Sequence, residues 1–160
     1  MITVNRASIN DLSNIIAYGR DAFERSNYAP LGYNSVIARR TIKAAIMDQA
    51  MRVFVAKKDG VLCGVLVGMI DAMPFCAGLS ATDLVFTATH GGDLLLDAFV
   101  AWCKERKVTR IDMGVSQEEN DEVITALYQR KGFVRAGGLF YQQKQDHVRG
   151  IASNKQEEAA

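Results

Sequence analysis

The chain has 160 residues, of which 49% are hydrophobic, and its formal net charge is +1. This length is enough for one domain with a substantial core and too short to expect two domains. A net charge so close to zero gives no electrostatic reason to expect binding to nucleic acid or to an anionic membrane surface. We therefore expect neither as a partner.

Apolar patterning and cysteine use indicate where the protein works. Met1–Arg6 lacks the layout of a signal peptide, and the longest apolar run, Val61–Ile70, is too short to span a bilayer. The three cysteines (Cys63, Cys76 and Cys103) are an odd number without CxxC spacing, which favours reduced thiols that pack in the interior. We expect a cytoplasmic protein.

The first half of the chain predicts a strand, two helices and a hairpin. Ile2–Arg6 alternates weakly and indicates a strand, and Ser8–Asp11 has the spacing of a capping box at the start of a helix. A second helix is expected from about Ser35 to Ala50. Arg52–Lys58 and Val61–Asp71 are rich in valine and are separated by Asp-Gly, which predicts a β-hairpin.

The second half predicts alternating strands and helices. Met73–Ala81 contains proline and glycine and indicates a loop. A short strand, Leu84–Phe86, then leads through a Gly-Gly pair into an amphipathic helix, Asp93–Lys107. Another strand, Arg110–Val115, precedes a helix that ends near Lys131.

Two last short strands are expected at Val134–Ala136 and Leu139–Gln143, around a second Gly-Gly pair. Residues 145–160 are polar and predict a disordered tail, so the folded domain is expected to be 1–144. The element order is β-α-α-β-β-β-α-β-α-β-β. Strands and helices mix within one domain, which predicts an α/β or α+β fold around a mixed sheet.

The first glycine pair, Gly91-Gly92, has the properties of an anion site. Glycines that open a helix leave backbone N–H groups unpaired at the positive end of the helix dipole, and this suits a phosphate. The alternative is a tight strand-to-helix turn with nothing bound. Asp93 would repel a diphosphate unless its side chain points away.

Over residues 2–143 the chain resembles the GCN5-related N-acetyltransferases (GNAT). The resemblance is sharpest in the strand–Gly-Gly–helix unit that ends at Trp102 and in Ala126–Phe133, which is similar to the family's LYxxxGF signature. The glycine pair followed by leucines and a tryptophan-containing helix is most similar to acetyltransferases encoded in phage genomes. The resemblance implies one GNAT-like domain, with a mixed, mostly antiparallel central sheet flanked by about four helices.

The resemblance also implies a co-substrate and partners. Acetyl-CoA is the expected co-substrate, with no metal, and the acceptor is expected to be an amine on a small molecule or a protein. A homodimer is a common state in the family. The implied cofactor-binding residues are Val85, Phe86, Thr87, His90, Gly91, Gly92, Asp93 and Leu94. The main chain of Val85 and Phe86 would face the pantetheine arm if their strand splays from its neighbour.

One departure from the family pattern lies in this loop. The usual pyrophosphate motif is Arg/Gln-x-x-Gly-x-Gly/Ala. Aligned on Gly92, this chain has Thr87 in place of the basic or amide residue and His90 in place of the first glycine. An alternative register puts His90 in the arginine's place. In either register the backbone amides remain available for an anion.

The expected catalytic residues are Tyr128 and Asp83. A phenol with a pKa of about 10 stays protonated at neutral pH, so Tyr128 would donate a proton to the leaving CoA thiolate; a core tyrosine is the alternative. Asp83, whose strand leads into the loop, would take the proton of the amine. Asp71, Glu24 and a water chain are the other candidates for this base.

Three functions compete on the sequence alone. The first is an N-acetyltransferase in which the amine attacks acetyl-CoA directly in a ternary complex. The second is a catalytically silent GNAT-fold module for binding or assembly, which the altered loop favours. The third is a Cys–His nucleophilic enzyme, which needs Cys76 or Cys103 beside His90.

Overall fold

The computed structural model describes residues 1–115 and 121–143. The strands are β1 (Ile2–Arg6), β2 (Met51–Lys58), β3 (Val61–Ala72), β4 (Leu79–Ala88) and β5 (Arg110–Asp112). The α-helices are α1 (Leu12–Glu24), α2 (Ser35–Met47), α3 (Gly92–Glu105) and α4 (Asp121–Arg130), with short 3-10 helices η1 (Ile9–Asp11) and η2 (Ala29–Leu31). Contacts divide the chain into two compact units. The first comprises Met1–Ala22 and Asn34–Gly114, and the second comprises Phe23–Tyr33 and the described residues from Val115 onward.

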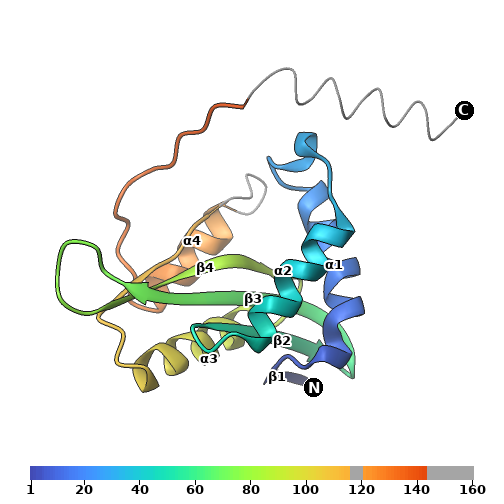
Figure 1. Cartoon of the computed structure of the whole chain (residues 1–160), viewed down its shortest axis with the longest axis horizontal. Coiled ribbons are helices and arrows are strands. Elements are labelled where there is room, and N and C mark those ends of the chain that lie inside the picture. The colour runs from blue at the N-terminus through green and yellow to red at the C-terminus, as the bar shows by residue number, and fades with distance from the viewer. Residues whose placement is uncertain (116–120, 144–160) are drawn as a thin grey trace, which may run out of the picture. The chain divides into compact units, whose positions relative to one another are not determined.

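The five strands of the first unit form one sheet in the order β1-β2-β3-β4-β5 (Figure 1). Every neighbouring pair is antiparallel except β4 and β5, which run parallel. The expected mixed, mostly antiparallel sheet is thereby confirmed. The predicted hairpin joins β2 to β3, and its turn residues Asp59 and Gly60 both have positive φ (51° and 83°), as a two-residue hairpin turn requires.

Helix α3 packs on one face of the sheet, and two glycines of β3 let it come close. A Cβ atom on Gly68 would stand 2.3 Å from the ring of Phe99, and a Cβ atom on Gly64 would stand 2.8 Å from Leu95. No side chain fits between strand and helix at these two positions. Trp102 of α3 completes this layer by packing edge-on against Phe54 of β2.

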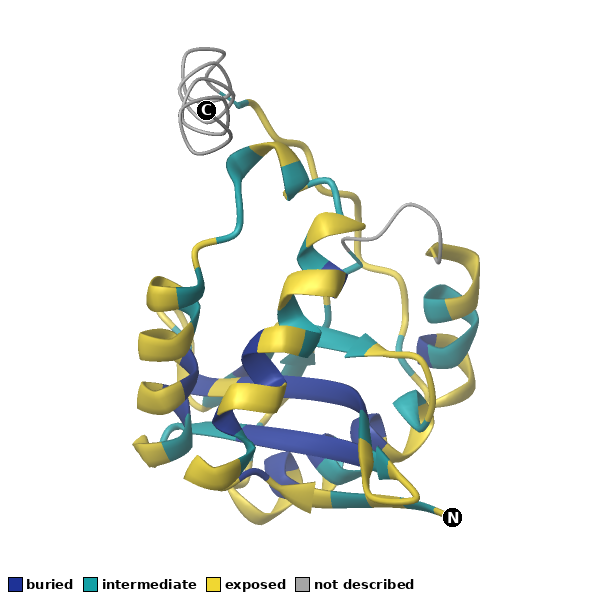
Figure 2. Ribbon diagram, turned by 90° about the vertical axis from the view of Figure 1, so that its right-hand side faces the viewer, coloured by how far each residue is buried: buried dark blue, intermediate teal, exposed yellow. Residues whose placement is uncertain are grey.

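The opposite face of the sheet is also covered. Four valines alternate with the residues under α3, and each is at most 2% exposed: Val53 and Val55 of β2, and Val65 and Val67 of β3 (Figure 2). Helix α2 packs on β2, and Arg39 of α2 donates a hydrogen bond to α1, so these two helices lie side by side. Because both faces are buried, β2 and β3 are continuous apolar runs rather than alternating ones.

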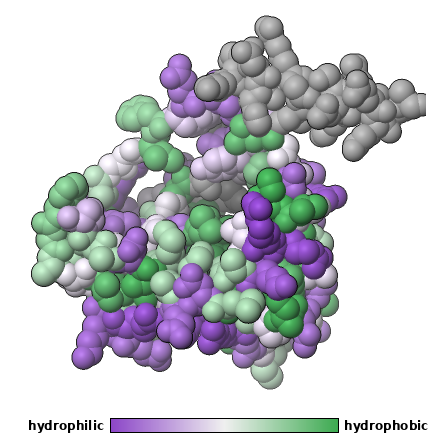
Figure 3. Space-filling model, in the orientation of Figure 1, coloured by the Kyte–Doolittle hydropathy of each residue, from purple (hydrophilic) through white to green (hydrophobic). Residues whose placement is uncertain are grey.

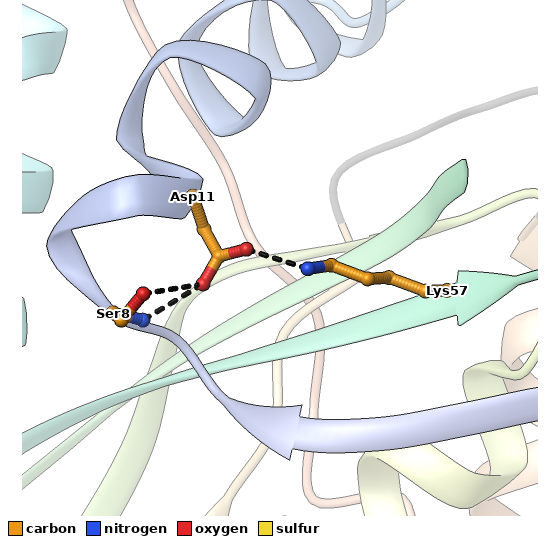
Figure 4. A network of polar contacts seen from close by, with 3 residues as sticks. All are labelled: Ser8, Asp11 and Lys57. Carbon is orange, nitrogen blue, oxygen red and sulfur yellow. Dashed lines mark hydrogen bonds and ion pairs between the residues drawn. The ribbon is translucent and has the colours of Figure 1, made fainter. Parts of the chain in front are cut away.

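The start of α1 is fixed by the carboxylate of Asp11 (Figure 4). One of its oxygens accepts hydrogen bonds from the backbone N–H and the hydroxyl of Ser8, at 2.8 and 3.1 Å, and the other accepts from Nζ of Lys57 at 2.7 Å. The Lys57 ammonium and the Ser8 amide hold the pKa of Asp11 below its ordinary value. The predicted capping residues therefore connect the first helix to β2.

Three expectations for this part of the chain need correction. Strand β4 begins at Leu79, so the loop after β3 is shorter than expected. The strands expected at Val134–Ala136 and Leu139–Gln143 are not formed: this segment pairs with no described strand, and its apolar side chains are exposed. Cys76 is exposed in the β3–β4 loop instead of packing in the interior, although Cys63 and Cys103 are buried as expected.

The second unit contains η2, α4 and an aromatic cluster. The ring of Phe23 lies 6.4 Å from that of Tyr28 and 5.4 Å from that of Tyr33. In α4, the hydroxyl of Thr125 donates to the carboxylate of Asp121 one turn earlier. The expected disordered tail, 145–160, lies outside the described residues.

The surface of the first unit carries an apolar loop between β3 and β4. Hydrophobic side chains gather over this loop at the left-hand end of Figure 3, and Phe75 within it is 98% exposed. None of the helices in the described part of the chain is both long and apolar enough to cross a membrane.

Candidate functional site

The sheet opens between its last two strands. Ser80–Thr82 of β4 pairs with Arg110–Asp112 of β5, and the pairing stops there, although β4 continues to Ala88. Within the described ranges, no strand lies along this edge of β4 from Asp83 onward. An open edge of this kind is where an extended ligand can pair with a strand through main-chain hydrogen bonds.

A β-bulge in β4, opposite β3, lies at the point where β4 and β5 separate. Val67 of β3 lies opposite Val85, but the next residue, Gly68, lies opposite Asp83, so Leu84 is an extra residue in β4. A bulge bends a strand and increases its local twist. Leu84 is 51% exposed, as a residue outside the ladder can be. The pairing of β4 with β5 ends at Thr82, directly before this bulge.

Asp83 stands at this opening. Its Oδ1 accepts a hydrogen bond of 2.9 Å from the backbone N–H of Gly114, two residues beyond β5. The carboxylate thus takes the place of a ladder partner where the main chains have separated. Burial raises the pKa of Asp83, against the opposing effect of the Gly114 amide. A carboxyl group with a raised pKa is closer to the range in which a general base works at neutral pH.

The loop after β4 is anchored to Cys63, near the start of β3, and to Tyr18, in the middle of α1. The carbonyl oxygen of Cys63 accepts from the backbone N–H of Thr89 at 2.8 Å and from that of His90 at 3.3 Å. The phenol oxygen of Tyr18 accepts from the same Thr89 N–H at 3.0 Å and donates to the Cys63 carbonyl at 2.8 Å. The amides of Thr89 and His90 are therefore occupied by the protein.

The backbone N–H groups after the glycine at position 91 are not occupied in this way. Gly91 has the left-handed conformation (φ 74°, ψ 19°), and a Cβ atom there would stand 2.9 Å from Ile2. The first helical bond runs from Leu95 N to Gly91 O. The N–H groups of Gly92, Asp93 and Leu94 find no acceptor among residues 1–115 and 121–143. Three donors thus project from the positive end of a 14-residue helix.

Side chains near these amides are small or exposed. A Cβ atom on Gly92 would meet Ala88 at 3.6 Å and the ring of Phe86 at 3.8 Å, which are ordinary contacts. The side chains of His90 and Asp93 are exposed, and that of Thr87 is half-buried. All eight expected cofactor-binding residues therefore lie on β4, on the loop or on the first turn of α3, together with Asp83.

Tyr128 belongs to the second unit. It is 8% exposed, its ring lies 5.6 Å from that of Phe133, and its carbonyl accepts from the amides of Lys131 and Phe133 where α4 ends. The LYxxxGF residues thus form one local structure. The proton-donating role of Tyr128 stays a prediction.

The structure also places the alternative base Asp71 and the candidate nucleophile Cys103. Asp71 is exposed near the end of β3, opposite Ser80. Burial raises the pKa of Cys103 to about 11, so its thiol is neutral and a poor nucleophile near neutral pH. Cys103 also lies about three turns along α3 from His90. In the described part of the chain, no group of three or more His, Cys, Asp or Glu side chains is placed to hold a metal ion.

Neither Tyr18 nor Cys63 was predicted from the sequence to be part of this site. The hydrogen bond between Tyr18 and Thr89 spans 71 residues of sequence, and that between Cys63 and Thr89 spans 26. A tyrosine within an amphipathic helix and a cysteine in an apolar strand carry no local signal of such a contact. The pairing of β3 with β4 brings Cys63 to the loop, and the position of α1 beside the start of β3 brings Tyr18 there.

Comparisons with known proteins yield a family match and a set of similar folds. A family model described as an acetyltransferase (GNAT) domain matches residues 4–130. No curated protein matches the chain.

Several solved structures share the fold at low identity. AAC(6')-Iy in complex with the bisubstrate analogue CoA-S-monomethyl-acetylneamine is 14% identical, with a TM-score of 0.72 over 91% of this chain and 99% of that one. A predicted acetyltransferase with acetyl-CoA from Clostridium acetobutylicum is 13% identical, with a TM-score of 0.68 over 89% and 96%. The ribosomal-protein-alanine N-acetyltransferase from Brucella melitensis biovar Abortus 2308 is also 13% identical, with a TM-score of 0.67 over 90% and 99%.

Proposed function

Because the chain belongs to the GNAT family of acetyltransferases, we propose that it moves an acetyl group from acetyl-CoA to an amine by direct attack in a ternary complex. The observation that carries this proposal is the row of unpaired amides at Gly92, Asp93 and Leu94, next to the open edge of β4. An anion site and a strand edge in series match the two parts of coenzyme A, its diphosphate and its pantetheine arm.

The diphosphate would be bound mainly by backbone groups. The three amides and the α3 dipole supply the positive potential, and in the described loop no lysine or arginine replaces the family's basic residue. The exposed His90 side chain is the nearest candidate for an added contact. Asp93 opposes binding only if its exposed carboxylate turns toward the phosphates. We therefore expect acetyl-CoA to bind more weakly than in relatives with an arginine in the loop.

The pantetheine arm would lie along β4 beyond the bulge. In the antiparallel ladder of β3 and β4, Thr89 is hydrogen-bonded to Cys63, so alternation directs the main-chain groups of Phe86 away from β3. That is the side on which β5 has diverged. The side chains of Val85 and Phe86 are half-buried and contribute packing.

In the proposed chemistry, the amine nitrogen forms a bond to the acetyl carbon while the carbon–sulfur bond breaks. Asp83 would accept the proton that the amine loses, and its raised pKa and position at the strand opening support this assignment. The phenol of Tyr128 would donate a proton to the departing thiolate, which leaves as the free thiol. Most of the rate enhancement would come from positioning the two substrates.

Relatives with the same fold act on different acceptors by their descriptions. One is solved with an analogue that joins CoA to an acetylneamine, and another is a ribosomal-protein-alanine N-acetyltransferase. These point to an amine as the acceptor class and leave both small-molecule and protein amines open for this chain.

Two measurements test the proposal. Isothermal titration with acetyl-CoA should show binding, and incubation with a panel of small-molecule amines and peptide N-termini, followed by mass spectrometry, should yield a product that has gained one acetyl group. Absence of binding at millimolar acetyl-CoA would support the silent GNAT-fold module instead, which the replaced loop residues favour. Binding with no acetylated amine from either class would leave binding without catalysis as the function.

A further inference from the structure

The loop that carries the proposed diphosphate site is held by a side chain from a distant helix. Tyr18 is the middle residue of α1, and its hydroxyl both accepts from Thr89 N and donates to Cys63 O. Thr89 N already donates to the Cys63 carbonyl at 2.8 Å. The phenol therefore bridges the two sides of an existing hydrogen bond and ties the loop to the sheet.

The position of this bridge is specific. The bulge between β2 and β3 leaves Cys63 as an extra residue, because Ala56 lies opposite Gly64 while Lys57 lies opposite Leu62. The carbonyl of Cys63 accepts from the amides of Thr89 and His90, from the Tyr18 phenol and, at 3.2 Å, from the Thr89 hydroxyl. Four donors therefore converge on the Cys63 carbonyl, and three of them belong to Thr89 and His90, the last two residues before the glycine pair.

The bridge matters because this loop has no long basic side chain to grip a ligand. Where backbone amides must bind an anion by themselves, affinity depends on how well those amides are held in the binding geometry before the ligand arrives. Gly91 adds freedom directly before the three donors. A fixed Thr89–His90 segment offsets that freedom.

We propose that Tyr18 is a positioning residue for acetyl-CoA: its phenol fixes the β4–α3 loop so that the amides of Gly92–Leu94 are arranged to receive the diphosphate. This inference rests on the proposed function. It assigns to α1 a part in binding the co-substrate, at a residue that does not itself touch the three donor amides.

The test replaces Tyr18 with phenylalanine, which removes the hydroxyl and keeps the ring. Tyr141→Phe is the matched control, because Tyr141 is an exposed tyrosine outside this loop. The dissociation constants of acetyl-CoA and of S-acetylpantetheine, which lacks the diphosphate, are measured for the wild-type protein and both variants. Amide hydrogen exchange at Thr89 and His90 is measured without ligand.

Tyr18→Phe should raise the dissociation constant of acetyl-CoA about tenfold, which corresponds to about one hydrogen bond. It should leave that of S-acetylpantetheine unchanged and speed exchange at Thr89 and His90. Tyr141→Phe should change none of these values. In a turnover assay the KM for acetyl-CoA should rise while kcat stays within about twofold, since Tyr18 touches no reacting atom.

Equal affinity of wild type and Tyr18→Phe for acetyl-CoA would refute the positioning role and leave the proposed function standing. An equal loss for acetyl-CoA and S-acetylpantetheine would also refute it, because it would show a general structural effect. If the wild-type protein itself bound no acetyl-CoA, the proposed function would fail and this inference with it.

Discussion

Replacing Gly92 with glutamate should remove most of the affinity for acetyl-CoA without harming the fold. Gly92 has no positive φ, and a Cβ atom there meets only Ala88 and Phe86 at ordinary distances. Glutamate is also favourable in the first turn of a helix. The substitution therefore adds a negative charge beside the three donor amides and little else.

The size of the effect follows from Coulomb's law. A carboxylate about 6 Å from each of two phosphate charges costs about 0.7 kcal/mol per charge in bulk water and about 2.8 kcal/mol at a surface dielectric of about 20. For two charges, with screening by physiological salt, we expect about 1.5 to 3 kcal/mol, or about 10- to 150-fold in the dissociation constant.

Isothermal titration at two salt concentrations checks this reasoning. Gly92→Gln, which has nearly the same shape without the charge, and Gly92→Ala should bind acetyl-CoA much better than Gly92→Glu. The penalty of glutamate relative to glutamine should shrink as salt increases. If Gly92→Glu binds as tightly as Gly92→Gln, the diphosphate lies elsewhere and the assignment of the site is wrong.

Three further substitutions test the rest of the site and its support. Tyr128→Phe should lower kcat about 100-fold or more with little change in acetyl-CoA affinity, and unchanged turnover would remove Tyr128 from the mechanism. Asp83→Asn keeps an oxygen that can accept from Gly114 N but cannot act as a base, so kcat should fall by a similar factor while the fold persists. Because the pKa of Asp83 is raised in the folded state, wild-type turnover should decline as pH falls through that pKa, while the contribution of Asp83 to folding stability should increase. The Asp83→Asn variant should show neither trend. An identical pH profile for the variant and the wild type would exclude Asp83 as the base. Gly68→Ala should destabilise folding by about 1 to 3 kcal/mol in urea titrations, since its Cβ would overlap Phe99, whereas Gly137→Ala, with open space around it, should be near neutral.

The parts of the fold that sequence reasoning predicted well are those fixed by local chemistry. The Asp59-Gly60 turn needs two residues with positive φ, and this requirement is visible in the dipeptide. The cap at Ser8 and Asp11 and the glycine pair before α3 are local in the same sense. Each of these signals lies within four residues of sequence, so one chain is enough to recognise it.

The features that were missed depend on distant partners. Strand β4 begins at Leu79 because that residue pairs with Ala72 of β3, although Pro74 and Gly78 suggested a longer loop. Val134–Ala136 has a strand-like composition, but a strand also needs a neighbour for its hydrogen bonds, and the described chain supplies none there.

Only part of the geometry of the candidate site could be predicted from the sequence, for a similar reason. Its glycines and leucines carry a pattern, whereas the divergence of β5 and the bulge at Leu84 are properties of pairing between strands. The surroundings of Asp83 at the opening could not be predicted from its position in the sequence alone. Its contact with Gly114 exists only because the two strands separate there.

Gly64 links the packing of the sheet to the proposed co-substrate site. A methyl group on this buried residue would press on Leu95, on Ala88 and on the carbonyl of His90 at once, all of them at the entrance to α3. Because no space is left beneath the helix at this position, even one added methyl group would push on the first turn of α3 and shift the donor amides that face the solvent above it. Interior packing and the proposed co-substrate site would therefore be damaged together by the same substitution.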